Sequence, residues 1–301
     1  MNDPFHDGER QAQSLANAET PPFVAGIRDF MPDQHREFFA GLPYLFVGAL
    51  DEAGWPTATV LAGEPGFIAS PAPRTLEIAL DAPGDPVAER LTPGAEVGML
   101  GLDLSNRRRN RVNGVVAARQ DRRLTIDVLQ SFGNCPQYIQ TRLAETGRAP
   151  PGPVEGFDGL DTEAEQTLAT TDTLFVASHA SGPNGGVDIS HRGGLPGFVL
   201  REGPVLTIPD YRGNRFFNTL GNLVSDPRAA LLLVDFQTGD LTALQGRAQV
   251  LWTPPGDMPK AERAWTLTVE RGQRRRRALP LRWAFGAFAP TTLATGGELA
   301  P

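Results

Sequence analysis

The sequence predicts a mainly β (α+β) protein made of two tandem β-barrels with short helices. Short apolar runs separated by Gly and Pro dominate the chain, helical periodicity occurs only in brief stretches, and the pattern repeats once. Many short strands with turn signals between them are typical of barrels, whereas a parallel sheet would need longer helices between its strands.

Apolar runs and periodicity place the individual elements. The longest apolar run, at 229–234, predicts a buried strand, and shorter ones predict the strands of the first half at 44–50, 57–61, 75–80, 97–102 and 124–129. Helical spacing predicts helices at about 34–40, 135–146, 162–170 and 216–224. Asn134 would cap the second of these, with Pro136 in its first turn.

The two halves of the chain repeat each other with an offset of about 130 residues. Leu45-Phe46-Val47 recurs as Leu174-Phe175-Val176, and three further apolar segments recur in the same order. Asn113-Gly114 falls opposite Gln245-Gly246. We therefore divide the chain into an N-terminal arm (1–33), a first barrel repeat (34–150) and a second repeat (160–301), joined by the Pro/Gly-rich stretch 148–159.

The copies differ where a ligand would bind. After its central strand the first copy is acidic (81–96), whereas the second is rich in Arg and Asn (209–229). The second copy is therefore the expected ligand site, and the first is a degenerate partner that covers the site or forms a dimer surface.

Two motifs of the second copy suit a phosphorylated planar cofactor. Ser190, His191, Arg192 and Gly193 end a strand-like run, where backbone N–H groups and the Arg192 fork could bind phosphate. The alternative is a hairpin turn with exposed polar side chains.

The second motif, residues 211–215, precedes a helix. Asn214 and Arg215 would join the helix N-terminus in binding an anion. The alternative is a solvated loop capped by Asn214, and Phe216 and Phe217 are expected in the core.

Composition excludes several classes of function. A net charge of −7 argues against a general nucleic-acid binder, and one Cys with four dispersed His residues predicts no disulfide and no dedicated metal site. Without an apolar run near 20 residues or a secretory-type N-terminus, we expect a cytoplasmic protein without a membrane span.

Arg supplies nearly all the positive charge, since Lys260 is the sole lysine. The Arg runs 107–111 and 274–277 are interpreted as solvated faces, with attraction of an anionic substrate or nicotinamide donor as the alternative. Cys135 is expected to have a packing or capping role.

Four segments resemble the pyridoxamine 5′-phosphate oxidase-like superfamily of FMN-binding split barrels, and within it the doubled branch of flavin-nucleotide-binding proteins. They are RVNG (111–114), GNCPQYIQ (133–140), DISHRGG (188–194) and IPDYRGNRFFNTLGNL (208–223). The resemblance extends from about Phe38 to Trp252.

The resemblance implies an FMN-dependent oxidoreductase acting on an unknown small molecule, with NAD(P)H as a possible donor. It also implies a homodimer with the flavin at the subunit boundary, and a ferredoxin-type electron-transfer partner. A non-catalytic flavin or haem carrier, or a deazaflavin in place of FMN, are the alternatives. The glutamine that contacts the flavin ring in this family corresponds to a position near Leu241, where this chain has no polar side chain.

The resemblance assigns the cofactor-binding residues, and His191 is the single candidate for proton donation. These residues are Ser190, His191, Arg192, Gly193, Pro209, Asn214, Arg215 and Asn218.

Overall fold

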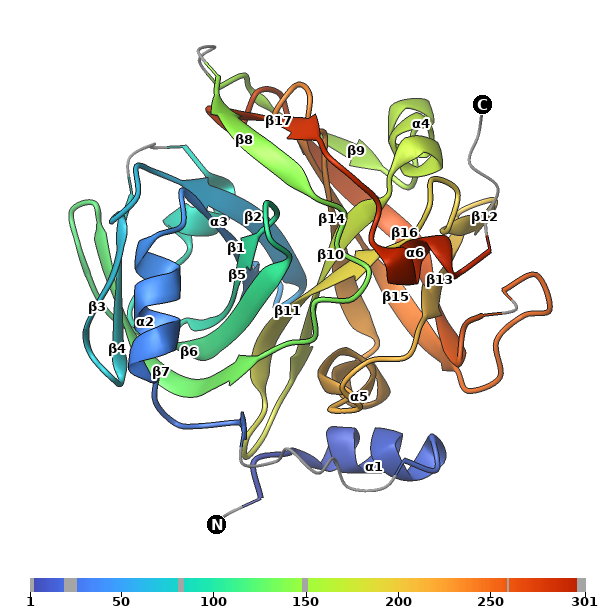
Figure 1. The fold of residues 1–301 in the computed structure, drawn as a ribbon, viewed down its shortest axis with the longest axis horizontal. Coiled ribbons are helices and arrows are strands. Elements are labelled where there is room, and N and C mark those ends of the chain that lie inside the picture. The colour runs from blue at the N-terminus through green and yellow to red at the C-terminus, as the bar shows by residue number, and fades with distance from the viewer. Residues whose placement is uncertain (1–2, 19–25, 81–83, 148–150, 259, 297–301) are drawn as a thin grey trace.

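A computed structural model describes residues 3–18, 26–80, 84–147, 151–258 and 260–296, which form two β-barrels packed against each other (Figure 1). The strand order is β2-β1-β5-β6-β7-β4-β3 in barrel 1 and β11-β10-β14-β15-β16-β13-β12 in barrel 2. The two orders are the same once the strands are matched, so the predicted fold of two tandem barrels is confirmed.

Barrel 1 consists of seven strands and two helices. They are α2 (Asp33–Ala40), β1 (Tyr44–Leu50), β2 (Pro56–Ala62), β3 (Ile68–Ala72), β4 (Thr75–Ala79), α3 (Pro86–Glu89), β5 (Glu96–Asp103), β6 (Arg108–Gln120) and β7 (Arg123–Gly133).

Barrel 2 has the same plan, with an additional strand β9 paired to β16. Its elements are β9 (Val154–Asp158), α4 (Thr162–Thr170), β10 (Thr173–Ala180), β11 (Gly186–Gly193), β12 (Leu200–Glu202), β13 (Val205–Asp210), α5 (Asn218–Ser225), β14 (Arg228–Val234), β15 (Leu241–Leu251) and β16 (Arg263–Arg275).

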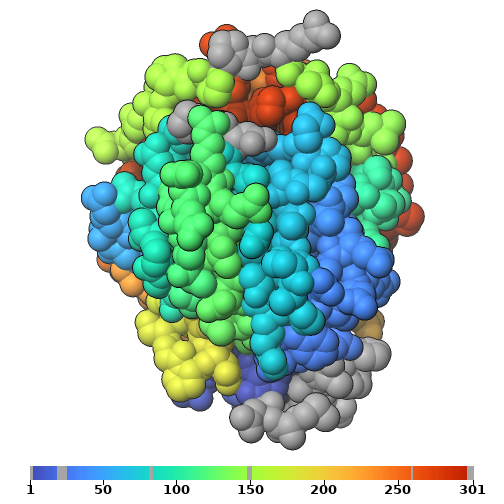
Figure 2. Space-filling view, turned by 90° about the vertical axis from the view of Figure 1, so that its left-hand side faces the viewer, coloured from blue at the N-terminus to red at the C-terminus, as the bar shows by residue number. Residues whose placement is uncertain are grey.

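Three further parts lie outside this plan. Helix α1 (Asp7–Leu15) of the N-terminal arm packs against α5, and β8 (Arg142–Thr146) pairs with β17 (Leu281–Phe285) in a small sheet. Figure 2 shows C-terminal residues, orange to red, at one end of barrel 1. Helix α6 (Pro290–Leu293) follows β17. Within the described residues, no helix is both long and apolar enough to cross a membrane.

The apolar runs form strands because their side chains enter closed cores. In β4, Leu76 and Ile78 are fully buried in the core of barrel 1, while the other three residues of the strand are partly exposed. The run 229–234 is buried on both faces: Leu231 and Leu233 enter the core of barrel 2, and Leu232 enters the core between the barrels. Burial of both faces explains why this run lacks the usual polar alternation.

The matching Asn-Gly and Gln-Gly pairs mark the same bulge in each barrel. The strand register shifts at Asn113/Gly114 in β6 and at Gln245/Gly246 in β15. A Cβ atom at Gly114 would lie 2.2 Å from the Asp127 carbonyl oxygen, so only glycine fits where the facing strand comes this close.

The barrels meet around an approximate two-fold axis. Phe46 and Phe175, which the repeat matches to each other, stack with ring centroids 3.7 Å apart. The strand contacts are reciprocal, because β2 packs on β14 and its counterpart β11 packs on β5. Such an interface normally joins two identical subunits; here one chain supplies both halves.

The prediction of a helix at 135–146 is wrong. Residues 134–141 are not helical and 142–146 form strand β8. Burial between the barrels overrides the local pattern: the Ala289 N–H donates to Gln140 Oε1 at 2.9 Å, and Arg142 pairs with Asp172 at 2.6 Å. Asn134 therefore caps no helix.

Smaller differences concern the helix near 216 and the N-terminal arm. Helix α5 begins at Asn218, because Arg215 and Phe217 adopt positive φ values of 60° and 63°; Phe216 and Phe217 are buried as expected. Helix α1 was not predicted from the sequence, although His6 and Glu9 form a capping box. Parts of four expected segments lie outside the described residues, namely 1–2 and 19–25 of the arm, 81–83 of the acidic segment, 148–150 of the joint, and 259 and 297–301 of the second repeat.

Candidate functional site

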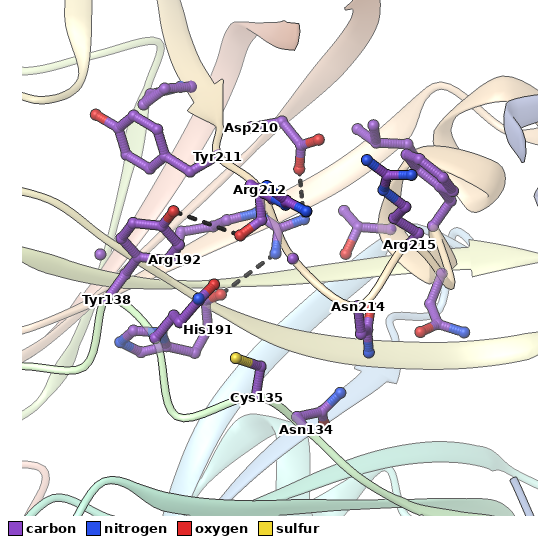
Figure 3. A pocket seen from close by; sticks show the side chains of 18 of the residues that line it. Asn134, Cys135, Tyr138, His191, Arg192, Asp210, Tyr211, Arg212, Asn214 and Arg215 are labelled. Carbon is purple, nitrogen blue, oxygen red and sulfur yellow. Dashed lines mark hydrogen bonds and ion pairs between the residues drawn. The ribbon is translucent and has the colours of Figure 1, made fainter. Parts of the chain in front are cut away.

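A pocket lies where the two barrels meet, and both contribute to its walls (Figure 3). Barrel 1 supplies residues of β6 and the segment after β7, and barrel 2 supplies the end of β11, the end of β13, the following loop and the first turn of α5. The pocket thus occupies the boundary that, in a dimer of single barrels, would separate two subunits.

The structure brings seven of the eight sequence-predicted residues to this pocket: His191, Arg192, Gly193, Pro209, Asn214, Arg215 and Asn218. Arg192 and Arg215, which come from different elements, line the same pocket and do not lie on opposite surfaces. Ser190 does not line it. Its fully buried hydroxyl bonds to the Thr219 hydroxyl at 2.8 Å, behind the wall.

Barrel 1 contributes two arginines that sequence analysis did not assign to the site. Arg109 donates from Nε to the Cys135 carbonyl oxygen at 2.7 Å, and Arg111 donates from Nη1 to both carboxylate oxygens of Asp188 at 2.9 Å. The interpretation of the first Arg run as a solvated face is wrong for these two residues. Alternation along β6 turns Arg109 and Arg111 to the same side. The RVNG motif (111–114) was the available signal for Arg111, and no motif marked Arg109.

The second Arg run, 274–277, is also not a solvated face in its first two members. Arg274 and Arg275 are buried and form ion pairs with Asp161 and Asp85, respectively. They therefore stabilise the fold.

Positive charge dominates the pocket. Asp210 pairs with Arg263 at 2.9 Å and is 3.9 Å from Arg192, whereas Arg109 has no carboxylate partner within the described residues. Burial, reinforced by Arg111 and Arg192, lowers the pKa of Arg109 to about 9, so that it remains charged at neutral pH. A cation held this way is stabilised by a bound anion.

His191 is fixed in one tautomer. Arg109 Nη1 lies 3.3 Å from His191 Nδ1, and because arginine only donates, Nδ1 accepts and the proton resides on Nε2. Burial and the charges of Arg109 and Arg192 hold the pKa of His191 well below its usual range. The ring is therefore neutral, and its Nε2–H can donate to a ligand oxygen.

Several buried polar atoms of the site lack partners within the described structure. They are His191 Nε2, Arg192 Nε, Arg111 Nε and Asn134 Oδ1. Buried donors and acceptors are normally satisfied in folded proteins. A ligand that accepts from several donors at once, as a phosphate does, would satisfy most of them.

The first turn of α5 adds backbone donors, and the repeat shows how unusual it is. The corresponding helix of barrel 1, α3, is capped by the Asp85 carboxylate, which accepts from the backbone N–H groups of Val87 and Ala88 at 2.9 Å. Helix α5 has Phe217 at this position and no side-chain cap. Barrel 2 therefore leaves open the anion position that barrel 1 fills with its own carboxylate.

Two tyrosines lie beside this cationic pocket. The rings of Tyr138 and Tyr211 stack with centroids 5.0 Å apart, and the Tyr138 hydroxyl donates to the Arg212 carbonyl oxygen at 3.4 Å. The cavity measures about 100 Å³. A pocket for a whole small molecule is typically roughly 300–1,000 Å³, so this volume suits a phosphate group, with the rest of a ligand outside it.

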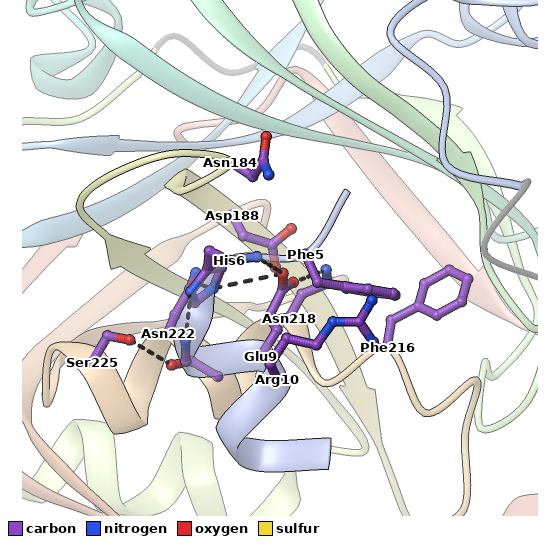
Figure 4. A network of polar contacts seen from close by, with 12 residues as sticks. Phe5, His6, Glu9, Arg10, Asn184, Asp188, Phe216, Asn218, Asn222 and Ser225 are labelled. Atoms are coloured by element: carbon purple, nitrogen blue, oxygen red, sulfur yellow. Dashed lines mark hydrogen bonds and ion pairs between the residues drawn. The ribbon is translucent and has the colours of Figure 1, made fainter. Parts of the chain in front are cut away.

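The N-terminal arm supports the pocket from behind (Figure 4). Asn218 donates from Nδ2 to Glu9 Oε1, and the His6 N–H donates to Glu9 Oε2 at 3.0 Å. Burial raises the pKa of Glu9 to about 8. Asn218 and Arg111, which contact each other at 3.3 Å, are thus held by residues outside the pocket.

A comparison with protein-family models and one with curated proteins found no match. Solved structures do match. The FAD-binding protein of Mesorhizobium loti is 12% identical over 41% of this chain and 97% of its own, with a TM-score of 0.29. A Clostridium acetobutylicum protein of the pyridoxinephosphate oxidase family, related to a general stress protein, is 16% identical over 41% of this chain and 92% of its own, with a TM-score of 0.29.

The heme storage protein HutZ of Vibrio cholerae is 11% identical over 39% of this chain and 95% of its own, with a TM-score of 0.27. Each matched protein is thus about as long as one repeat of this chain. The structures to which this chain is similar thus include proteins described as FAD-binding and as belonging to the pyridoxinephosphate oxidase family, each matched over about 40% of this chain.

Proposed function

We propose that this protein binds FMN at the pocket between its barrels and is an FMN-dependent oxidoreductase acting on a small molecule. One observation carries the proposal: a cationic pocket with unpartnered donors lies at an uncapped helix start, where the repeat holds a carboxylate instead. The motifs shared with FMN-binding split barrels point to the same ligand.

The phosphate would lie at the first turn of α5, within reach of Arg192, Arg109 and the loop residues Asn214 and Arg215. Charge-assisted hydrogen bonds from arginine are the strongest the pocket can offer, and their geometry matches phosphate oxygens. The flavin ring would lie beside the stacked Tyr138 and Tyr211 pair, with His191 Nε2–H available to an oxygen of the ligand.

When bound, the flavin supplies the redox chemistry, and the protein supplies binding and orientation. Arg109 keeps the His191 proton on Nε2, and the pairing of Asp210 with Arg263 leaves Arg192 with only a 3.9 Å contact to that carboxylate. A donor such as NADH or NADPH, a ferredoxin-type partner and the cytoplasmic location remain part of the proposal.

The absorbance spectrum of the purified protein tests this proposal. Flavin bands, with FMN identified by mass spectrometry after denaturation, would support it. A colourless protein that also fails to bind added FMN would overturn it.

A second candidate is a flavin carrier without turnover. The low pKa of His191 favours it, because this imidazole is a poor proton donor near neutral pH. The same tautomer argues against haem, since Nε2 carries a proton and cannot also ligate iron. Rapid mixing of the FMN-loaded protein with NADH or NADPH separates the candidates: bleaching of the flavin indicates an enzyme, and an unchanged spectrum favours the carrier.

A further inference from the structure

A second pocket lies at the position that the two-fold axis relates to the candidate site. It is bounded by the ends of β2 and β4 in barrel 1, and by the end of β16 and the start of β17 from the other half of the chain. Its cavity measures about 400 Å³, which is within the usual size for a small-molecule pocket.

Strand pairing identifies the residues that correspond, in the other half of the repeat, to the cationic residues of the candidate site. Val60 pairs with Phe46 as His191 pairs with Phe175, and Leu61 pairs with Leu45 as Arg192 pairs with Leu174. The counterparts of Arg109 and Arg111 are found in the same way and are Leu241 and Ala243. His191, Arg192, Arg109 and Arg111 of the first pocket thus all have apolar counterparts in the other half of the repeat.

The anion position of this pocket is filled from within the protein. Asp85 caps α3, accepts from the Thr59 hydroxyl at 2.5 Å and pairs with Arg275. Both partners of this ion pair are buried, with 4% and 8% of their surface exposed. A phosphate would have to displace a carboxylate that already has four partners, so the pocket does not suit a phosphorylated ligand.

The remaining charges of the pocket are negative. Apart from the Asp85–Arg275 pair, the charged residues that line its described part are Glu64 and Glu145, both exposed. The apolar walls, which include Leu61, Leu80 and Leu281, therefore lead to an acidic rim. An apolar molecule is stabilised by the walls, and a positive charge on it could remain partly solvated beside the two carboxylates.

We propose that this second pocket is a binding site for a small apolar amine, whose hydrocarbon body lies between the two barrels and whose ammonium group lies at Glu64 and Glu145. The chain would thus hold two ligand sites of opposite charge preference at equivalent positions. This site does not depend on flavin binding at the first pocket.

Calorimetric titration with three probes of one shape tests the proposal on the full-length protein. These are 4-phenylbutylamine, 4-phenylbutanol and 4-phenylbutyrate, which carry a positive, no and a negative charge. The amine should bind at least 10-fold more tightly than the carboxylate, with the alcohol between them. Equal affinities, or no binding of the amine, would overturn the proposal.

Two variants locate the binding. Glu64→Gln combined with Glu145→Gln should lower the affinity for the amine by roughly 3- to 10-fold and leave the affinity for the alcohol unchanged, as expected for exposed charges. Ala62→Phe, which places a large ring in the pocket at the half-buried end of β2, should lower the affinity for all three probes.

Glu37→Gln, which removes an exposed carboxylate from α2, is the matched control and should change nothing. If the amine binds the doubly substituted protein as tightly as the control, the site lies elsewhere and the proposal is wrong.

Discussion

Arg109 shows how a single side chain ties the two barrels to one site. It belongs to barrel 1, contacts His191 of barrel 2, and has no carboxylate partner within the described residues. Its role could not be predicted from the sequence, because an Arg run gives no sign of which members face inward. The residues of barrel 2 were easier to find, since they follow a glycine-rich turn and precede a helix.

Replacing Arg109 tests its role in anion binding. Arg109→Met should lower the affinity for FMN by roughly 10- to 100-fold, because a charge-assisted hydrogen bond contributes about 1.5–3 kcal/mol. Thermal stability should be kept or should rise, because a half-buried charge without a carboxylate partner among the described residues is removed. Quenching of flavin fluorescence measures the affinity.

Arg74→Met, at an exposed arginine paired with Asp29, is the control and should bind FMN normally. If the two variants bound FMN with equal affinity, Arg109 would not contribute to FMN binding.

Glu9 makes stability depend on pH. Its pKa is raised from 4.5 to about 8 in the folded protein, so between these values the folded state holds a proton that the unfolded state has lost. The contribution of Glu9 to the free energy of unfolding is therefore complete below pH 4.5, falls as pH rises and is lost above about pH 8. Urea unfolding from pH 5 to 8.5 should therefore show a steeper loss of stability for the native protein than for Glu9→Gln.

The two proteins should differ by on the order of a few kcal/mol in how much unfolding free energy they lose across this pH range. Identical pH profiles would contradict the raised pKa of Glu9.

Helix α1 holds the pocket through close contact with α5. A Cβ atom at Gly221 would lie 2.6 Å from the Glu9 backbone, and one at Gly8 would lie 2.4 Å from the Gly221 carbonyl oxygen. The sequence predicted an N-terminal arm but not this helix, because α1 is short and its partner lies some 200 residues away. The segment at 135–146 was predicted incorrectly for a related reason: contacts with the other barrel, rather than local spacing, determine its shape.

Gly221→Ala tests the contact between α1 and α5. Alanine favours helix over glycine by about 1 kcal/mol, so the substitution would stabilise a free helix. Here we expect destabilisation by roughly 1–3 kcal/mol and faster proteolysis of the N-terminal arm, because the added methyl group overlaps the Glu9 backbone. Gly256→Ala, where no atom lies within 4 Å, is the control. A stabilised Gly221→Ala protein would show that α1 does not pack as described.

At the scale of the whole molecule, the repeat provides both halves of a two-fold interface within one chain. The sequence repeat was sufficient to predict two barrels of the same plan. It could not show that their equivalent phenylalanines stack on each other, nor that the site draws on both barrels. A homodimer of the whole chain stays a prediction, and it is not needed to complete the pocket.

Removal of one stacked ring tests the coupling of the barrels. Phe175→Ala should destabilise the protein by about 3–5 kcal/mol, as for other buried aromatic rings. Both barrels should still unfold in one transition, because their shared core spans the interface. Phe285→Ala, at a ring that is 51% exposed, is the control and should cost about 1 kcal/mol or less. Two separate calorimetric transitions in the native protein would contradict a shared core.

The central claim is that cationic groups of both barrels hold a flavin by its phosphate. Titration of the flavin-free protein with FMN and with riboflavin, which lacks only the phosphate group, tests it most directly. We expect FMN to bind at least 100-fold more tightly than riboflavin, and the difference to shrink about 10-fold or more in Arg192→Ala. Equal binding of the two flavins would show that the pocket between the barrels is not a phosphate site.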